Sequence, residues 1–253
     1  MIHAIAVDGY GMDAPTVGAT LFVRGEDFGL PGSLSARMVR ASGALRRGLL
    51  IADDDGIWDP AAFDELPFID VTVISSNHTD AELILGPGEG MNMLLVNVSG
   101  QLTLSELNYA PPSLTAVEPL SVPTIGGANV TLRGSNFGVG KSFVLQLSGP
   151  GSLPEHCDFE FTEADLAVSA GGSNPEGAVW AYNHECLSFT APSGQCDVPM
   201  DLTLTVAGQQ ALESLELSFD PPIIDMLSKD GITRLGSDCD RNEELGCDLS
   251  TNG

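Results

Sequence analysis

The chain has 253 residues, and its 10 Lys and Arg stand against 35 Asp and Glu, for a formal net charge of −25. Nucleic acids and anionic membrane surfaces both require clustered cations, so this charge argues against either partner. No apolar run reaches the ~18 residues that span a bilayer, so we expect no membrane insertion by this segment. Residues 1–7 lack the basic start of a secretory leader, so the leader is absent here or the chain is part of a longer protein.

Alternation of apolar and polar residues with a period of two predicts many short strands. The clearest segments, in chain order, are Thr20–Arg24, Val71–Ile74, Ala81–Leu85, Phe143–Leu147 and Leu202–Val206. Turns rich in Gly and Pro separate them, and hydrophobic residues make up 43 % of the chain, enough for packed cores. These features predict an all-β fold of sandwich type, with helix confined to one or two turns at Pro60–Leu66.

An internal repeat organises the strands. Three segments return about 110 residues later: Gly25–Gly29 as Gly134–Gly138, Ser99–Gln101 as Ala207–Gln209, and Leu107–Pro112 as Leu217–Pro222. Each copy has the size of one sandwich domain. We therefore expect domains at residues 1–111 and 112–220. Residues 221–253 form a partial third repeat or a linking tail, which is too short to fold alone.

One part of this repeat resembles a known family. The segment Pro112–Pro119, followed by Gly126–Gly138, resembles the opening of an IPT/TIG domain, which has an immunoglobulin-like fold, and Ala14–Gly29 is a looser version of it. The resemblance implies tandem immunoglobulin-like (IPT/TIG) β-sandwiches of the extracellular or cell-surface array type, joined by short Pro-Pro linkers. The Gly pair at its start permits a tight turn into the next strand, and Phe137 is expected to lie beneath the sandwich. The Pro-Pro joins at Pro111 and Pro221 predict a semi-rigid rod.

Cysteines and glycosylation sequons indicate an oxidising, secretory compartment. Cys239 and Cys247 enclose a short polar loop, which favours a local disulfide. Among the other three, the pairs Cys157–Cys186 and Cys186–Cys196 are both plausible, and the sequence does not choose between them. The sequons at Asn77, Asn97 and Asn129 predict N-linked glycans, and strand phase places the last two on solvent faces.

The chemistry-bearing motifs have simpler interpretations. Gly134–Ser142 misses a phosphate-binding loop by one residue and is followed by a strand, and Gly86–Gly90 is interpreted as a turn between strands. The His residues His3, His78, His156 and His184 show no ligand spacing. The only metal candidates are a weak Ca²⁺ site at Asp53, Asp54 and Asp55, and an EF-hand-like run beginning at Asp238 that lacks the central Gly and the closing Glu. We therefore expect no enzyme activity and no cofactor.

Charge indicates one self-association hypothesis. The basic cluster Arg37, Arg40, Arg46 and Arg47 and the acidic tail residues Asp238, Asp240, Glu243 and Glu244 are its candidate partners. The leading hypothesis is a non-enzymatic extracellular structural protein, a semi-rigid glycosylated rod that associates head-to-tail into a filament or surface coat. The alternative is a cell-surface receptor or adhesion ectodomain that binds a protein or glycan ligand. A third hypothesis is a spacer appended to a carbohydrate-active enzyme.

Overall fold

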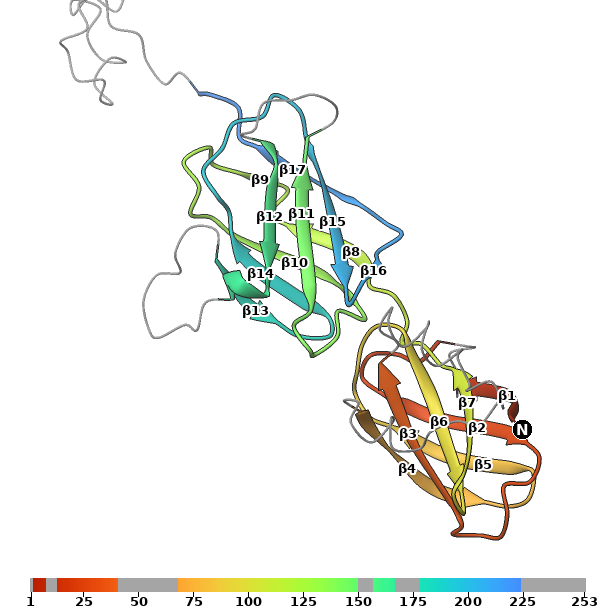
Figure 1. Ribbon diagram of the computed structural model, residues 1–253. Helices are drawn as coiled ribbons and strands as arrows, with labels where there is room; N and C mark the ends of the chain where they lie inside the picture. The colour runs from red at the N-terminus through yellow and green to blue at the C-terminus, as the bar shows by residue number, and fades with distance from the viewer. Residues whose placement is uncertain (1, 8–12, 41–67, 150–156, 167–177, 224–253) are drawn as a thin grey trace, which may run out of the picture. The chain divides into compact units, whose positions relative to one another are not determined.

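The computed structural model describes residues 2–7, 13–40, 68–149, 157–166 and 178–223 (Figure 1). Met1–Phe219 form one compact unit. The described residues of the second unit, Asp220–Ile223, carry no strand or helix. Across the described part of the chain, regular structure is β apart from one 3-10 turn, η2 (Glu163–Asp165). The expected all-β, immunoglobulin-like sandwich architecture is confirmed.

The first sandwich is a seven-stranded antiparallel sheet that surrounds its own core. Its strands are β1 (Ile2–Val7), β2 (Ala19–Gly25), β3 (Leu34–Arg40), β4 (Phe68–Ser76), β5 (Asp80–Leu85), β6 (Asn92–Val98) and β7 (Gln101–Glu106). They lie in the order β1-β2-β5-β4-β3-β6-β7. The core lies between Ala14 and Tyr109 in sequence, and alternate residues supply it, such as Leu21 and Val23 on β2.

The second sandwich consists of two facing sheets. Its strands are β8 (Ser113–Glu118), β9 (Ser121–Val122), β10 (Asn129–Ser135), β11 (Phe143–Ser148), β12 (Phe159–Thr162), β13 (Val179–Tyr182), β14 (Cys186–Thr190), β15 (Met200–Val206), β16 (Gln209–Gln210) and β17 (Leu215–Phe219). One sheet has the order β13-β14-β10-β8 and the other β12-β11-β15-β17-β9, with β16 on β15. Their core runs from Leu114 to Phe219 and is separate from the first. All five strand segments expected from the alternation are found.

The repeated motif builds the same turn twice. In both Gly25–Gly29 and Gly134–Gly138, the third and fifth residues have positive φ, at 61° and 76° in the first copy and 60° and 77° in the second. The fourth residue, Phe28 or Phe137, is buried in the core of its own sandwich. The ring therefore anchors the turn, as the sequence predicts for Phe137.

A second repeated feature is a hairpin turn that begins with Asn-His, which the sequence comparison missed. In Asn77–Asp80 the Asn Oδ1 accepts hydrogen bonds from the backbone N–H groups two and three residues on, both at 2.8 Å. In Asn183–Cys186 the same two bonds are both 2.9 Å. In each copy the His carbonyl accepts from the N–H of the buried Phe, at 3.1 Å and 3.0 Å. The Asn side chain supplies an acceptor that holds the turn without a longer loop.

The disulfide of the second sandwich corrects the sequence expectation. Cys157 and Cys196 are bonded, with their Cα atoms 5.7 Å apart, so both expected pairs that use Cys186 are wrong. Cys186 begins β14, and that whole strand separates it from the loop that carries Cys196. Cys157 lies just before β12 in the other sheet, within reach of that loop. Cys186 is a half-buried free thiol.

Candidate functional site

The most buried acidic side chain among the described residues lies where the two sandwiches meet. Glu89 belongs to the loop Gly86–Gly90 between β5 and β6, and it is only 7 % exposed. Its Oε2 accepts a hydrogen bond from the backbone N–H of Gly140 at 2.9 Å, and its Oε1 lies 3.6 Å from Arg40 Nη2. The carboxylate of the first sandwich is thus held by a backbone donor of the second and a cation of the first.

Glycine makes this approach possible. Gly138 has φ +77°, and a Cβ there would collide with the Glu89 side chain. Gly90 also has φ +77°, and its Cβ would lie 2.8 Å from that of Ala207. Gly86–Gly90 connects β5 and β6, and the second half of Gly134–Ser142 connects β10 and β11, so both are turns between strands, as expected. Their glycines allow the two loops to come into contact. The loop with the imperfect phosphate-binding pattern does receive an anion, but that anion is the protein's own carboxylate.

Three further hydrogen bonds cross between the sandwiches. Asn136 Oδ1 accepts from the Thr16 backbone N–H at 3.3 Å, and the Thr16 hydroxyl lies 2.8 Å from His184 Nδ1. The Gln209 side chain donates to the Tyr109 carbonyl at 3.0 Å. We call this contact the seam: Thr16, Glu89 and Tyr109 of the first sandwich against Asn136, Gly140, His184 and Gln209 of the second. Four hydrogen bonds between described residues therefore join the sandwiches, whereas stiffening by the Pro-Pro joins stays a prediction.

Two phenols lie beside the seam, Tyr109 buried and Tyr182 half-buried. The Tyr109 hydroxyl donates to the Gly86 carbonyl at 2.8 Å, and burial raises the pKa of Tyr109 well above its ordinary value. The Tyr182 hydroxyl donates to the Phe137 carbonyl; burial raises the pKa of Tyr182, and the negative charge of Glu89 raises it further. Both rings therefore stay neutral donors at physiological pH.

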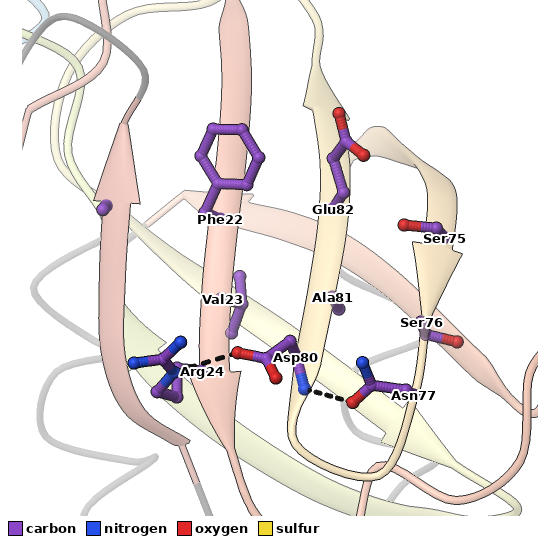
Figure 2. Close-up of a pocket in the computed structure, with 10 residues that line it drawn as sticks. Phe22, Val23, Arg24, Ser75, Ser76, Asn77, Asp80, Ala81 and Glu82 are labelled. Atoms are coloured by element: carbon purple, nitrogen blue, oxygen red, sulfur yellow. Dashed lines mark hydrogen bonds and ion pairs between the residues drawn. The ribbon is translucent and has the colours of Figure 1, made fainter.

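A second feature is a groove on the outer face of the first sandwich, with a volume of about 590 Å³ (Figure 2). Strand register places its residues in two rows across β2, β5 and β4. Phe22 pairs with Glu82, which pairs with Ser75, and Arg24 pairs with Asp80 in the next row. The neighbouring hairpin contributes Asn77. The groove therefore combines one aromatic ring with donors and acceptors of both charge types.

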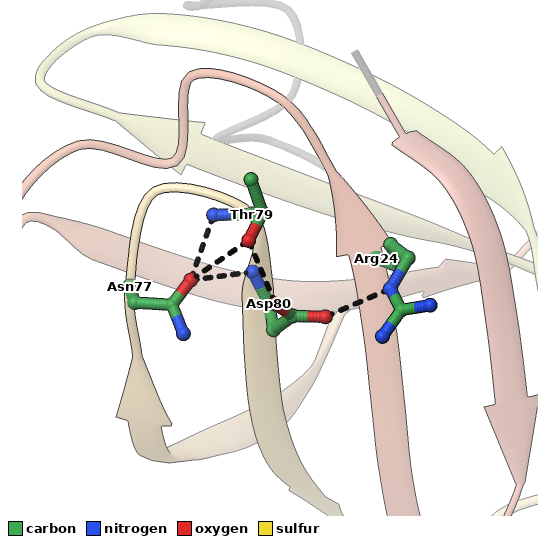
Figure 3. A network of polar contacts seen from close by, with 4 residues as sticks. All are labelled: Arg24, Asn77, Thr79 and Asp80. Carbon is green, nitrogen blue, oxygen red and sulfur yellow. Dashed lines mark hydrogen bonds and ion pairs between the residues drawn. The ribbon is translucent and has the colours of Figure 1, made fainter.

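The polar end of the groove is a connected network (Figure 3). Asp80 Oδ1 accepts from Arg24 Nε at 2.9 Å, and its Oδ2 accepts from the Thr79 hydroxyl at 2.7 Å. The bonds from Thr79 and Arg24 lower the pKa of Asp80 below its ordinary value, so the carboxylate is ionised. The network fixes Arg24 and Asn77 at the groove's edge, although each side chain is exposed to solvent.

The expected glycosylation sites fall in three different environments. Asn77 lies in the exposed hairpin turn, and its Oδ1 is used by that turn. Asn97 on β6 is half-buried, with its Oδ1 accepting from the Gly100 N–H at 2.8 Å. Asn129 begins β10 and is exposed, with Val130 and Leu132 pointing into the core as the strand phase predicts. Glycan occupancy at all three stays a prediction.

The structure disperses the expected basic cluster as far as it describes it. The Arg37 guanidinium lies 5.1 Å from the centre of the Phe68 ring, and Arg40 faces Glu89. The remaining candidates for self-association, metal binding or disulfide formation lie outside the described residues: Arg46, Arg47, Asp53, Asp54, Asp55, Asp238, Cys239, Asp240, Glu243, Glu244 and Cys247. The same holds for the expected helix at Pro60–Leu66. For these residues the expectations stay predictions.

Two searches of the described residues gave no candidates. No three His, Cys, Asp or Glu side chains within that part of the chain converge as metal ligands. Where the structure describes the chain, it also has no helix with the length and apolar character of a membrane span.

Sequence reasoning missed the role of Glu89 and the groove residues. The available signal for Glu89 was a lone carboxylate between glycines, in a loop that has no other reason to carry a charge. The groove had no local signal, because Phe22, Ser75 and Glu82 come together only through strand pairing.

Comparison with known proteins identifies one of the two sandwiches. The family model described as "IPT/TIG domain" matches residues 112–220, whereas no curated protein matches the chain. Among solved structures, the chain is similar to the protein SGBP-B from a xyloglucan utilization locus of Bacteroides uniformis, with 16 % identity and a TM-score of 0.28, covering 85 % of this chain and 48 % of that one. It is also similar to the plexin A4 extracellular region, domains 1 to 8, with 12 % identity and a TM-score of 0.32, covering 85 % of this chain and 18 % of that one.

The chain is also similar to domains 5–6 of the S-layer protein SbsC, with 11 % identity and a TM-score of 0.26, covering 88 % of this chain and 99 % of that one. The chain spans 48 % of the length of SGBP-B and 39 % of the length of another solved structure, described as a crystal structure with xylogluco-oligosaccharide. The glycine pair, the buried Phe137 and the paired sheets lie in the matched segment. Residues 112–220 are therefore the part of the chain that the IPT/TIG family model identifies.

Proposed function

We propose that the protein is a non-enzymatic extracellular structural protein whose sandwiches are locked end to end and which associates head-to-tail with further copies of itself. The observation that carries this proposal is that the turns and hairpins that form the seam occur in both sandwiches. The second sandwich contacts the first through Asn136, His184 and Gln209. The corresponding residues of the first sandwich, by the repeated turns and hairpins, are Asp27, His78 and Gln101, and all three are exposed.

The opposite surface is repeated as well. In the first sandwich, the Thr16 carbonyl accepts from the Gly88 N–H at 3.0 Å, and the Thr124 carbonyl accepts from the Gly194 N–H at 3.0 Å in the second. Glu89, which follows Gly88, therefore corresponds to Gln195. Thr124 and Gln195 are exposed. In the proposed contact, Asp27, His78 and Gln101 of one copy face Thr124 and Gln195 of the next copy.

The two surfaces match in hydrogen-bonding character. Gly140, whose N–H binds the Glu89 carboxylate, corresponds to Pro31, which has no N–H. The incoming residue at that place would be Gln195, which carries no charge. A contact between copies therefore avoids burying a carboxylate against a position that cannot donate to it. A heterologous contact of this kind, if it does not close, extends into a filament.

An extracellular location is supported by the Cys157–Cys196 disulfide, because such bonds persist in oxidising compartments. The N-glycans stay a prediction from the sequons. The receptor alternative stays a hypothesis from the family resemblance. A ligand of glycan type has separate support from the groove on the first sandwich.

The test is the assembly state of the full chain, measured by sedimentation velocity and electron microscopy. We expect concentration-dependent, end-to-end oligomers. Gln195→Glu places a carboxylate opposite Pro31 and Asp27 and should shift assembly to at least about tenfold higher concentration. Gln210→Glu adds the same charge at an exposed position outside the proposed contact and should leave assembly unchanged. A chain that stays monomeric at high concentration, or equal effects of the two variants, would refute head-to-tail association.

A further inference from the structure

The groove on the first sandwich contains an aromatic side chain that the core does not use. Phe22 lies between the buried residues Leu21 and Val23 on β2, so its own side chain points to the outer face, where it is 47 % exposed. Its neighbours across the sheet are Glu82 on β5 and Ser75 on β4 (Figure 2). An aromatic ring on a solvent face, bordered by polar groups, offers an apolar platform with hydrogen-bonding partners beside it.

Several polar groups of the groove have capacity left for a ligand. Arg24 uses its Nε for Asp80, and Asn77 uses its Oδ1 for its own turn, which leaves the remaining N–H groups of both as donors. The carboxylate of Glu82 has no ion pair or hydrogen bond within the part of the chain that the structure describes. The Ser76 hydroxyl is buried with no hydrogen-bond partner among those residues. The groove thus offers donors and acceptors in alternation.

Charge restricts the class of ligand. The Arg24–Asp80 pair neutralises itself, so Glu82 leaves the groove weakly negative. The whole chain carries −25, which repels anions at a distance. A cationic ligand would be drawn to many surfaces of a chain with this net charge, so charge alone would not direct it to this groove. A neutral molecule with many hydroxyl groups and flat apolar faces fits all of these features.

We infer that this groove binds a neutral oligosaccharide, with one pyranose ring against Phe22 and hydroxyl groups bonded to Arg24 and Glu82. Sugar hydroxyls both donate and accept, so they satisfy the free groups of both kinds. The volume of about 590 Å³ suits a short stretch of sugar chain. The groove is open along the sheet, so the rest of a longer chain could continue beyond it. The groove shares no residue with the seam, but its Asn77 adjoins His78, which lies on the surface proposed to contact another copy.

The test is isothermal titration calorimetry of the full chain, produced without N-glycans so that Asn77 is unmodified. The probes are cellohexaose, mannohexaose and xylohexaose, with tetragalacturonate as an anionic probe of related shape. We expect at least one neutral probe to bind with a Kd between about 10 μM and 1 mM, and tetragalacturonate to bind at least about tenfold more weakly.

A matched pair of variants locates the site. Phe22→Ala should weaken binding at least about tenfold, the usual cost of losing an aromatic contact. Phe68→Ala removes a phenyl group that is also 47 % exposed on the first sandwich but lies outside the groove, and it should leave the Kd unchanged. Heat capacity scans of both variants check that the sandwich is folded. Absence of binding by all three neutral probes, preference for tetragalacturonate, or equal losses in the two folded variants would each overturn the inference.

Discussion

The carboxylate of Glu89 accepts a hydrogen bond from the backbone N–H of Gly140, 2.9 Å away in the next sandwich. A buried carboxylate is costly unless it is compensated, and here one peptide N–H donates to Oε2 while the Arg40 guanidinium forms an ion pair with Oε1 at 3.6 Å. The bond therefore exists only while both loops keep their glycine conformations. Four predictions follow from this contact and from others described above.

Gly138→Ala should open the seam. The new methyl group would collide with Glu89, and the alanine backbone would have to adopt φ +77°. We therefore expect a loss of about 2–4 kcal/mol in the free energy of unfolding. Amide hydrogen exchange at Gly140 should become faster, because its acceptor is displaced. Urea unfolding and exchange mass spectrometry measure the two effects.

Gly208→Ala is the matched control for that change. Gly208 has φ +83°, but a Cβ there would meet nothing within 4 Å. This variant should lose only about 1 kcal/mol, from backbone strain alone, and leave exchange at Gly140 unchanged. If both variants lose the same stability and Gly140 exchanges at the wild-type rate in each, the seam is not held by Glu89.

Removing the disulfide should destabilise the second sandwich alone. Cys157 and Cys196 are separated by 39 residues in sequence, and closing a loop of that size is worth about 4 kcal/mol in the chain-entropy model. The double variant Cys157→Ala/Cys196→Ala should therefore unfold its second sandwich at much lower urea concentration. Peptide mapping without reduction should yield the Cys157–Cys196 peptide pair; a pair that contains Cys186 would contradict the fold.

The two Asn-His hairpins should respond alike to the same substitution. Asn77→Ala and Asn183→Ala each leave two turn N–H groups without their side-chain acceptor, at a cost of about 1–2 kcal/mol to the sandwich concerned. Asn129→Ala, on an exposed strand end, should stay within about 0.5 kcal/mol of the wild type. Unequal losses in the two hairpins would show that they are not structurally equivalent. All three variants are compared in protein without glycans, so that the loss of a sequon has no effect.

Alkaline pH should unfold the protein through its buried phenols. Burial raises the folded-state pKa of Tyr109 and Tyr182 above the ordinary value of 10.0, so ionisation favours the unfolded chain. The stability that the neutral phenols contribute is fully present below pH 10 and declines as the pH rises above it. Ultraviolet absorbance should show both phenolates forming together with unfolding. Normal titration of both in the folded state would contradict their burial, and Tyr109→Phe/Tyr182→Phe should reduce the decline.

Local pattern was sufficient for the strands and for the fold class. In Leu202–Val206 the alternation of apolar and polar residues matches the burial of β15, because one face of a sandwich sheet must cover a core. The burial of Phe137 in the second sandwich could be predicted for a similar reason. Its ring lies in a turn between Gly134 and Gly138, and the nearest apolar environment is the core of that sandwich.

Pairings between distant residues could not be predicted in the same way. The sequence left two pairs open for Cys186, and neither forms, because the direction of β14 carries Cys186 away from the loop of Cys196. The groove was missed because the register between β2, β5 and β4 decides which polar residues lie beside Phe22. Glu89 was overlooked because its partner is a main-chain N–H, and any residue except proline carries one.

Of the four hydrogen bonds that join described residues of the two sandwiches, three have a peptide group on one side: the N–H of Thr16, the N–H of Gly140 and the carbonyl of Tyr109. A junction of this composition constrains few side chains. Neighbouring surface positions can therefore change in charge or size without removing these bonds.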